Sequence, residues 1–212
     1  MELGVVVAIT SPTAFLEVEK IPSLVRSLKG IISFWPATTI TVAVTEADEI
    51  ATLEILMAHG ISCELLKCDP NDPKTLAESL NFIIRNCAAL LLHDASRPLI
   101  SPQLLARILK AFESGVDAVR PSIAFTETLK VVGTNSLIGE TLDRSQMRRI
   151  STPEIIRTSA IDPQGENTGW FVPLIKGANV EYVEGDPESL RVNSVAERDL
   201  LESFLHWNET NA

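Results

Sequence analysis

Aromatic residues and positive charge are both scarce in this sequence. Phe, Trp and Tyr make up 5% of the 212 residues, and 18 Lys and Arg stand against 28 Asp and Glu, which gives a formal net charge of −10. Proteins bind the phosphate backbone of DNA or RNA largely through counterions that their Lys and Arg displace. The composition therefore argues against an extended nucleic acid as partner, whereas a single nucleotide needs only a few local cations.

Long apolar runs and a cysteine framework are absent as well. No apolar run approaches the roughly 20 residues that a membrane-spanning helix requires. Residues 1–9 lack the basic lead of a signal peptide. The three cysteines, Cys63, Cys68 and Cys87, are an odd number without a dense framework, as is typical of a reducing compartment. We therefore expect a cytoplasmic protein that does not associate with a membrane.

The sequence does contain a regular alternation of short apolar runs with segments of helical spacing. Runs typical of buried strands occupy residues 3–9, 39–44, 62–66 and 88–92, and another begins at Ala118. Helical spacing fills the intervals at 22–33, from Glu46 towards Gly60, at 73–84, and from Pro102 to Gly115. Such repeated units indicate an α/β fold, with a Rossmann-like, mostly parallel sheet and helices on both faces. We expect residues 1–212 to form a single domain.

A projecting β-arm is predicted where this alternation loosens, at about residues 122–150. Residues 128–132 and 137–142 are separated by a turn at 133–136, which is typical of a hairpin.

Ser194 and Glu197 form a capping box for a closing helix over 195–207. Between the arm and that helix the sequence predicts a short helix from Thr152-Pro153, a helix over 167–176, and strands at 180–183 and 190–192.

The loop after the most apolar run carries the clearest candidate site. In open parallel sheets, ligands bind beyond the carboxyl ends of the strands. Asp94 stands there and is able to hold Mg²⁺ beside a triphosphate, while Arg97 is able to hold a phosphate or orient the aspartate. The alternative is that Asp94 and Arg97 only pair with each other to fix the loop.

The same segment carries a resemblance to a known family. Residues 93–98 read His-Asp-Ala-Ser-Arg-Pro, which resembles the His-Asp-Ala-Ala-Arg-Pro signature of the 2-C-methyl-D-erythritol 4-phosphate cytidylyltransferases and their ribitol-phosphate relatives. Glu127-Thr-Leu-Lys130 is similar to the family's Asp-Thr-(Ile/Leu/Met)-Lys. Residues 143–154 and 184–192 are similar to its Arg…Gln-Thr-Pro-Gln and Glu-Gly-Asp/Ser…Lys-Ile/Val-Thr stretches. The resemblance covers nearly the whole chain.

This resemblance implies a nucleotidyltransferase-type fold, a homodimer that exchanges contacts through the β-arm, and CTP with Mg²⁺ as ligands. The nominal reaction is attack of a polyol phosphate, 2-C-methyl-D-erythritol 4-phosphate, on the α-phosphate of CTP, with release of pyrophosphate. The resemblance makes Asp94 and Arg97 catalytic, with Asp94 also on the metal. It assigns Thr128, Lys130, Arg144 and Arg191 to the substrate, and Ala8, Thr75 and Ala95 to the nucleotide.

The first loop departs from the family pattern. The family follows its first strand with a glycine-rich run that contains a catalytic arginine and ends in Pro-Lys. Here residues 8–11 lead directly to Pro12, and Thr13 takes the lysine position. Glycine lets backbone N–H groups wrap a triphosphate closely, and both cations would neutralise it. Because the loss of one charge-stabilising donor commonly costs about 10²–10³ in rate, we expect cytidylyl transfer to be weak or lost.

Other family positions also differ. Asp72 replaces an arginine and Thr75 a serine in the region that holds cytosine, Gly169 replaces a substrate-side aspartate, and Arg191 replaces a lysine. Two alternatives to a weakened enzyme stay open. One is a non-catalytic binding or dimer-partner paralogue that uses the same fold, and the other is an unrelated nucleotide-binding α/β protein.

Overall fold

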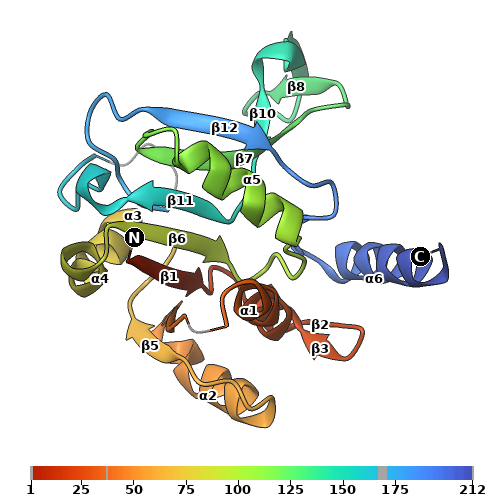
Figure 1. The fold of residues 1–212 in the computed structure, drawn as a ribbon. Coiled ribbons are helices and arrows are strands. Elements are labelled where there is room, and N and C mark those ends of the chain that lie inside the picture. The colour runs from red at the N-terminus through yellow and green to blue at the C-terminus, as the bar shows by residue number, and fades with distance from the viewer. Residues whose placement is uncertain (1, 37, 167–170, 212) are drawn as a thin grey trace.

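A mixed β-sheet of eight strands organises the part of the chain that the computed structural model describes, residues 2–36, 38–166 and 171–211 (Figure 1). Its order is β10-β7-β11-β6-β1-β4-β5, with β12 also paired to β7. The strands are β1 (Leu3–Ala8), β4 (Ile40–Val44), β5 (Glu64–Lys67), β6 (Ala89–Asp94), β7 (Ala118–Ala124), β10 (Arg148–Ile150), β11 (Glu154–Arg157) and β12 (Val180–Glu184).

Parallel pairing dominates this sheet, as the sequence predicts. β1 lies parallel to both β4 and β6, β4 to β5, and β12 to β7. β11 is antiparallel to β6 and β7, and β10 is antiparallel to β7. The carboxyl ends of β1, β4, β5 and β6 therefore lie at one edge of the sheet, where the candidate site was expected.

Helices cover both faces of the sheet because adjacent strand residues point to opposite sides. In β6, Leu91 packs in one apolar cluster with α1 (Ser23–Phe34), α5 (Pro102–Phe112) and part of α2 (Glu49–Ala58). Its neighbours Leu90 and Leu92 pack in the other cluster with α3 (Pro73–Ser79). A strand with apolar residues on both faces reads as a continuous apolar run, which is why these strands were recognisable from sequence.

Several predicted helix boundaries are refined by the structure. Thr45 caps a 3₁₀ turn, η2 (Glu46–Asp48), which leads into α2, and its Oγ1 accepts a hydrogen bond from Asp48 N. The helix expected over 73–84 is divided at Leu80 into α3 and α4 (Asn81–Asn86). The closing helix α6 (Val195–Asn211) begins with the predicted Ser194 cap, whose Oγ accepts from Glu197 N, and the Glu197 carboxylate accepts from Asn193 N, one residue before the cap.

Three predicted elements are wrong. The short helix expected from Thr152-Pro153 is instead strand β11, whose β-branched Ile155 and Ile156 are fully buried between β6 and β7. The strand expected at 190–192 is not formed among the described residues, although Val192 N donates to the Ser96 carbonyl.

The helix expected over 167–176 lies partly outside the described residues, and its described part, 171–176, is not helical. There Leu174 forms an antiparallel bridge with Ile161, and Pro173 offers no backbone N–H to a helix.

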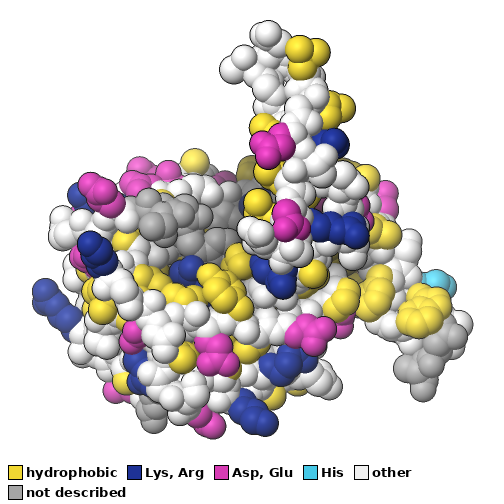
Figure 2. Space-filling view, turned by 90° about the horizontal axis from the view of Figure 1, so that it is seen from above, with side chains coloured by type: hydrophobic (Ala, Val, Ile, Leu, Met, Phe, Trp, Pro, Cys, Tyr) yellow, Lys and Arg dark blue, Asp and Glu magenta, His cyan; other side chains and the backbone are white. Residues whose placement is uncertain are grey.

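The predicted hairpin is confirmed as β8 (Leu129–Val132) and β9 (Ile138–Leu142), which project from the body (Figures 1 and 2). Apolar side chains on this arm lie open, with exposed fractions of 63% for Val132, 70% for Leu137 and 74% for Ile138. A second hairpin, β2 (Glu17–Val18) and β3 (Ile21–Pro22), connects η1 (Pro12–Phe15) to α1 and contacts α6. Within the described residues no helix is both long and apolar enough to cross a membrane.

Candidate functional site

Asp94 ends β6 at the carboxyl edge of the sheet and is the centre of a hydrogen-bonded cluster. Its Oδ1 accepts from Thr10 Oγ1 and from Ser96 N, each at 3.0 Å. Its Oδ2 accepts from Arg191 Nε at 2.7 Å, and Arg191 Nη2 donates to Thr10 Oγ1 at 3.0 Å. Three distant segments, after β1, after β6 and before α6, therefore meet on one carboxylate. The parallel-strand rule predicted the place, although it did not single out Thr10.

Arg97 holds the loop after β6 to the segment before α6. Its Nη1 donates to the Ser189 carbonyl at 2.7 Å, and its backbone N donates to the Asp94 carbonyl at 2.9 Å. Burial lowers the pKa of Arg97 to about 10, so the guanidinium is still charged at neutral pH. Asp94 makes its ion pair with Arg191, so the alternative in which Asp94 and Arg97 only pair with each other is not what the structure contains.

His93 supports the same loop from inside the protein. Its Nε2 lies 2.9 Å from the Arg97 carbonyl, which only accepts, so Nε2 carries the proton. Its Nδ1 must then accept from Thr152 Oγ1 at 3.1 Å, and Thr152 Oγ1 accepts in turn from Asp94 N at 3.1 Å. Burial of the ring lowers the pKa of His93 to about 4. His93 is thus a neutral connector between β6 and β11.

The loop after β1 presents hydroxyl groups where the family pattern has cations. Ser11 caps the 3₁₀ turn η1, with its Oγ accepting from Thr13 N. Thr13 Oγ1 lies 3.0 Å from Ser11 Oγ and 3.3 Å from Ser96 Oγ. Residues 9–16 contain neither glycine nor Lys or Arg. Uncharged groups of this kind can accept and donate single hydrogen bonds, but they do not neutralise a triphosphate.

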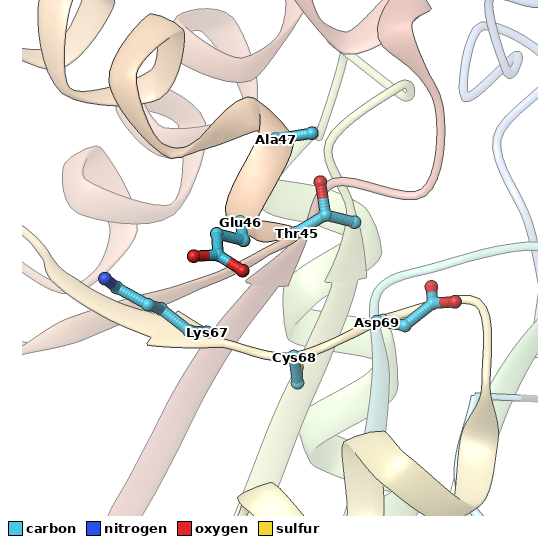
Figure 3. A pocket seen from close by; sticks show the side chains of 6 residues that line it. All are labelled: Thr45, Glu46, Ala47, Lys67, Cys68 and Asp69. Carbon is cyan, nitrogen blue, oxygen red and sulfur yellow. The ribbon is translucent and has the colours of Figure 1, made fainter.

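A cleft of about 870 Å³ opens at the same edge, beyond the ends of β4 and β5 (Figure 3). Thr45, Glu46 and Ala47 line one side of it, and Lys67, Cys68 and Asp69 line the other. Lys67 Nζ forms an ion pair with Glu49 at 2.8 Å. Because Glu46 and Asp69 add negative charge while Lys67 is already paired, this cleft does not make up for the cations missing from the first loop.

The three residues predicted to bind the nucleotide form hydrogen bonds within the chain. Ala8 and Ala95 are fully buried, and Ala95 N donates to the Ala8 carbonyl at 2.9 Å. Thr75 lies in the first turn of α3, where its Oγ1 donates to Asp72 at 2.5 Å. Asp72 caps this helix through Lys74 N, and hydrogen bonds to its carboxylate, that of Thr75 foremost, lower its pKa.

Most predicted substrate residues lie on the arm. Thr128, Lys130 and Arg144 are exposed, Lys130 Nζ donates to Thr141 Oγ1 at 2.5 Å, and Arg144 Nη1 donates to the Thr126 carbonyl. The arm projects away from β6 (Figure 1). Of the predicted substrate residues, Arg191 therefore contacts Asp94, whereas Lys130 and Arg144 contact residues of the arm.

The donors around Asp94 do not fit a resident metal ion. Mg²⁺ usually binds through one or two carboxylates that keep free oxygen lone pairs, together with water or phosphate. Here Asp94 is a single carboxylate that already accepts three hydrogen bonds, one of them from a guanidinium. Across the described ranges no three His, Cys, Asp or Glu side chains are grouped as metal ligands. The magnesium role of Asp94 stays a prediction.

Sequence reasoning missed the residues that support these groups. Thr10, Thr152 and Ser189 each contact Asp94, His93 or Arg97. Thr10 was within reach of prediction, because it is two residues past the end of β1 at the ligand edge. The contact of Ser189 with Arg97 spans 92 residues, and no local pattern reports it.

Comparison with known proteins supports one family. Residues 3–205 match the family model described as IspD, 2-C-methyl-D-erythritol 4-phosphate cytidylyltransferase. A protein of that name from Rubrobacter xylanophilus is 28% identical over 211 residues, which cover 93% of this chain and 89% of that protein. A bifunctional enzyme IspD/IspF from Nitratidesulfovibrio vulgaris is 27% identical over 188 residues, which cover 84% of this chain and 47% of the relative. The chain thus spans about half the length of such bifunctional relatives.

The fold is also similar to that of a solved structure. The crystal structure of 2-C-methyl-D-erythritol 4-phosphate cytidylyltransferase from Thermus thermophilus superposes with a TM-score of 0.74 at 21% identity, and the match covers 97% of this chain and 100% of that one. At this identity the likeness concerns the fold alone. Since the family model spans nearly the whole sequence, the chain belongs to the 2-C-methyl-D-erythritol 4-phosphate cytidylyltransferase family.

Proposed function

We propose that this protein is a cytidylyltransferase-family member of the isoprenoid precursor pathway in which cytidylyl transfer is weak or lost. The nominal reaction converts CTP and 2-C-methyl-D-erythritol 4-phosphate to CDP-methylerythritol and pyrophosphate. A phosphate oxygen of the polyol phosphate attacks the α-phosphorus of CTP, and the bond from that phosphorus to the bridging oxygen of the leaving pyrophosphate breaks. Such transfer depends mainly on positioning and on neutralisation of charge on the phosphoryl oxygens.

The residues of this chain would contribute mostly to positioning. Arg97 fixes the loop after β6 through the Ser189 carbonyl, and Asp94 and Arg191 occupy the edge where the phosphates would lie. Ala8 and Ala95 would leave room for the nucleotide, and Thr75 would contact it from the first turn of α3. From the arm, Thr128, Lys130 and Arg144 would meet the substrate phosphate. If Mg²⁺ accompanies CTP, it would be held mainly by the phosphates and would supply charge neutralisation there.

The shortage of usable cations at the ligand edge carries this proposal. The first loop offers the hydroxyls of Ser11 and Thr13. Arg191 is already paired with Asp94, and Arg97 donates to the Ser189 carbonyl. Two missing charge-stabilising donors, if independent, reduce a rate by on the order of 10⁴–10⁶. Groups that act as one unit are not additive, so the true factor is smaller.

We also propose that the protein is a homodimer in which the arm of each copy reaches the site of the other. Support comes from the open apolar residues of the arm, Val132, Leu137 and Ile138, and from the way the arm projects away from β6 (Figure 1). An exposed apolar surface on a projecting hairpin is typical of an interaction site. CTP and a polyol phosphate would be the small-molecule partners.

A second candidate is a non-catalytic binding or dimer-partner paralogue. The observation that favours it is the contrast between an intact core and arm and a first loop without glycine or cations. Such a protein would keep the fold for protein contacts, and the residues around Asp94 would then serve the architecture of the loops.

Two measurements separate these candidates. Pyrophosphate release from CTP, Mg²⁺ and 2-C-methyl-D-erythritol 4-phosphate should be at least about 100-fold below that of an active family member assayed alongside. Turnover near the roughly 10 s⁻¹ of an ordinary enzyme would overturn the weakened-site proposal. In a thermal-shift titration, stabilisation by CTP supports a nucleotide-binding protein, because a ligand that binds the folded state raises apparent stability, whereas no shift supports the paralogue.

A further inference from the structure

Each of the three nitrogens of the Arg191 guanidinium donates a hydrogen bond within the chain. Its Nε donates to Asp94 Oδ2 at 2.7 Å, its Nη2 donates to Thr10 Oγ1 at 3.0 Å, and its Nη1 donates to Asn193 Oδ1. The Asp94 side chain is 6% exposed and that of Arg191 is 30% exposed. All three nitrogens of the planar guanidinium thus donate to oxygen acceptors. The compact ammonium group of a lysine could not reproduce this arrangement.

The backbone that carries Arg191 is fixed on both sides of it. Val192 is fully buried, and its N donates to the Ser96 carbonyl at 2.8 Å. On one side, Arg97 holds the Ser189 carbonyl, and on the other, Asn193 N donates to the Glu197 carboxylate at 2.7 Å. The guanidinium is therefore positioned against Asp94 before any ligand binds, by contacts that involve the loop after β6 and the first turn of α6.

A positive ion that approached Asp94 would meet positive charge already in place. Arg191 lies on Oδ2, while Oδ1 faces Thr10 and the Ser96 amide, both of which point hydrogens at it. Arg97 adds a second, buried guanidinium close by. To ligate Asp94, a divalent cation would have to displace Arg191 and also overcome this repulsion.

We propose that Arg191 is a resident cation that occupies the Asp94 carboxylate in place of a divalent metal. The carboxylate is thereby neutralised and hydrogen-bonded, and it is closed to metal in the ligand-free protein. This inference concerns metal binding by the folded chain and holds whether or not the protein transfers cytidylyl groups. It also explains why a motif with the aspartate of a metal-dependent family need not signal a metal site.

Direct titration of the full-length protein with Mn²⁺ tests the inference. Free Mn²⁺ is measured by its electron paramagnetic resonance signal, with wild type compared to Arg191→Ala, Asp94→Asn and the double variant. Removal of one adjacent positive charge should tighten Mn²⁺ binding by about tenfold or more. The gain should be absent from the double variant, because the carboxylate is then missing. Arg198→Ala, which removes an α6 cation paired with Asp199, should behave as wild type.

Two results would overturn the inference. One is a saturable Mn²⁺ site in the wild type, as tight as in Arg191→Ala, that Asp94→Asn abolishes. The other is the absence of any gain in Arg191→Ala, once circular dichroism has shown that the variant is folded. If that variant does not fold, Arg191→Lys takes its place. Lysine keeps the positive charge but loses the planar guanidinium and its three hydrogen bonds. The Arg191→Lys variant should therefore bind Mn²⁺ more tightly than the wild type, and an unchanged affinity would count against the inference.

Discussion

At the scale of single residues, Thr13 allows a test of the proposed shortage of positive charge in the first loop. The side chain lies within reach of Ser11 and Ser96, directly beside the loop that carries Asp94. Thr13→Lys would add one positive charge at this edge. A charged hydrogen-bond partner contributes about 1.5–3 kcal/mol, so the variant should bind CTP about tenfold more tightly or better.

The control for Thr13→Lys is Thr13→Met, which has a similar length and no charge. Thermal-shift titrations with CTP should show the gain in the lysine variant alone, and added salt should weaken it. Equal CTP affinity in the wild type and both variants would mean that the first loop does not contact the phosphates, contrary to the proposed function.

His93 predicts a pH dependence of stability. Its pKa is lowered by burial to about 4, whereas an unfolded histidine titrates near 6.5. Between these values the unfolded chain binds a proton that the folded chain does not. The stabilisation is thus complete above pH 6.5 and falls as the pH decreases towards 4, by on the order of 3 kcal/mol in total.

Urea unfolding of the wild type and of His93→Gln between pH 4.5 and 7.5 measures this effect. The variant loses the titrating ring and should show a shallower decline in the free energy of unfolding, from a lower value at neutral pH. Parallel curves for the two proteins would contradict the assignment of His93 as a neutral connector, because all other titrating groups are shared.

At the scale of elements, apolar runs predicted strands correctly where the strand is buried on both faces. β1 and β6 are buried on both faces and stand out as runs such as Leu90–Leu91–Leu92. β11 did not stand out, because a proline after Thr152 is typical of the first position of a helix. Only the pairing of residues 154–157 with β6 and β7 makes this segment a strand.

The candidate site likewise contains residues that local sequence predicts and contacts that only tertiary structure creates. Asp94 and Arg97 were found because they follow a recognisable strand. The contacts of Arg191 with Thr10 and Asp94 join residues 181 and 97 positions apart, and tertiary structure alone brings them together. The sequence therefore pointed to Asp94, Arg97 and Arg191 one by one, but it revealed neither the contact with Thr10 nor the ion pair between Arg191 and Asp94.

The turn of the β2–β3 hairpin has a backbone conformation whose effect on the free energy of unfolding can be measured. Glu19 and Lys20 have φ values of 47° and 62°, as in two-residue turns that favour Asn-Gly. Glu19 has local partners, since it pairs with Arg26 at 3.0 Å and its N donates to Glu202 in α6 at 2.6 Å. Lys20→Gly keeps these contacts and removes the backbone strain of a non-glycine residue at positive φ, so it should stabilise the protein by roughly 0.5–1 kcal/mol.

Urea unfolding at neutral pH measures this change. Lys29→Gly in α1 is the matched control, and it should destabilise the protein, because glycine in a helix costs about 1 kcal/mol relative to good helix formers. A loss of stability in Lys20→Gly would show that the lysine side chain contributes more at this turn than its backbone strain costs.

At the scale of the whole molecule, the arm makes the proposed homodimer testable. Ile138 is 74% exposed on β9, and Met57 is 79% exposed on α2 in the body of the protein. The two side chains are similarly open, so replacing either with aspartate should barely affect folding of the monomer. If two copies join through their arms, Ile138→Asp places a charge in an apolar interface and should weaken association by several kcal/mol, enough to yield monomers at micromolar concentration.

Sedimentation equilibrium should then report a dimer for the wild type and for Met57→Asp, and a monomer for Ile138→Asp. A monomeric wild type would contradict the homodimer itself, and a dimer that survives Ile138→Asp and separates in Met57→Asp would place the interface on the body of the protein. Lys130 and Arg144 could not then reach a neighbouring Asp94, and the active-site role proposed for the arm would fail with the dimer.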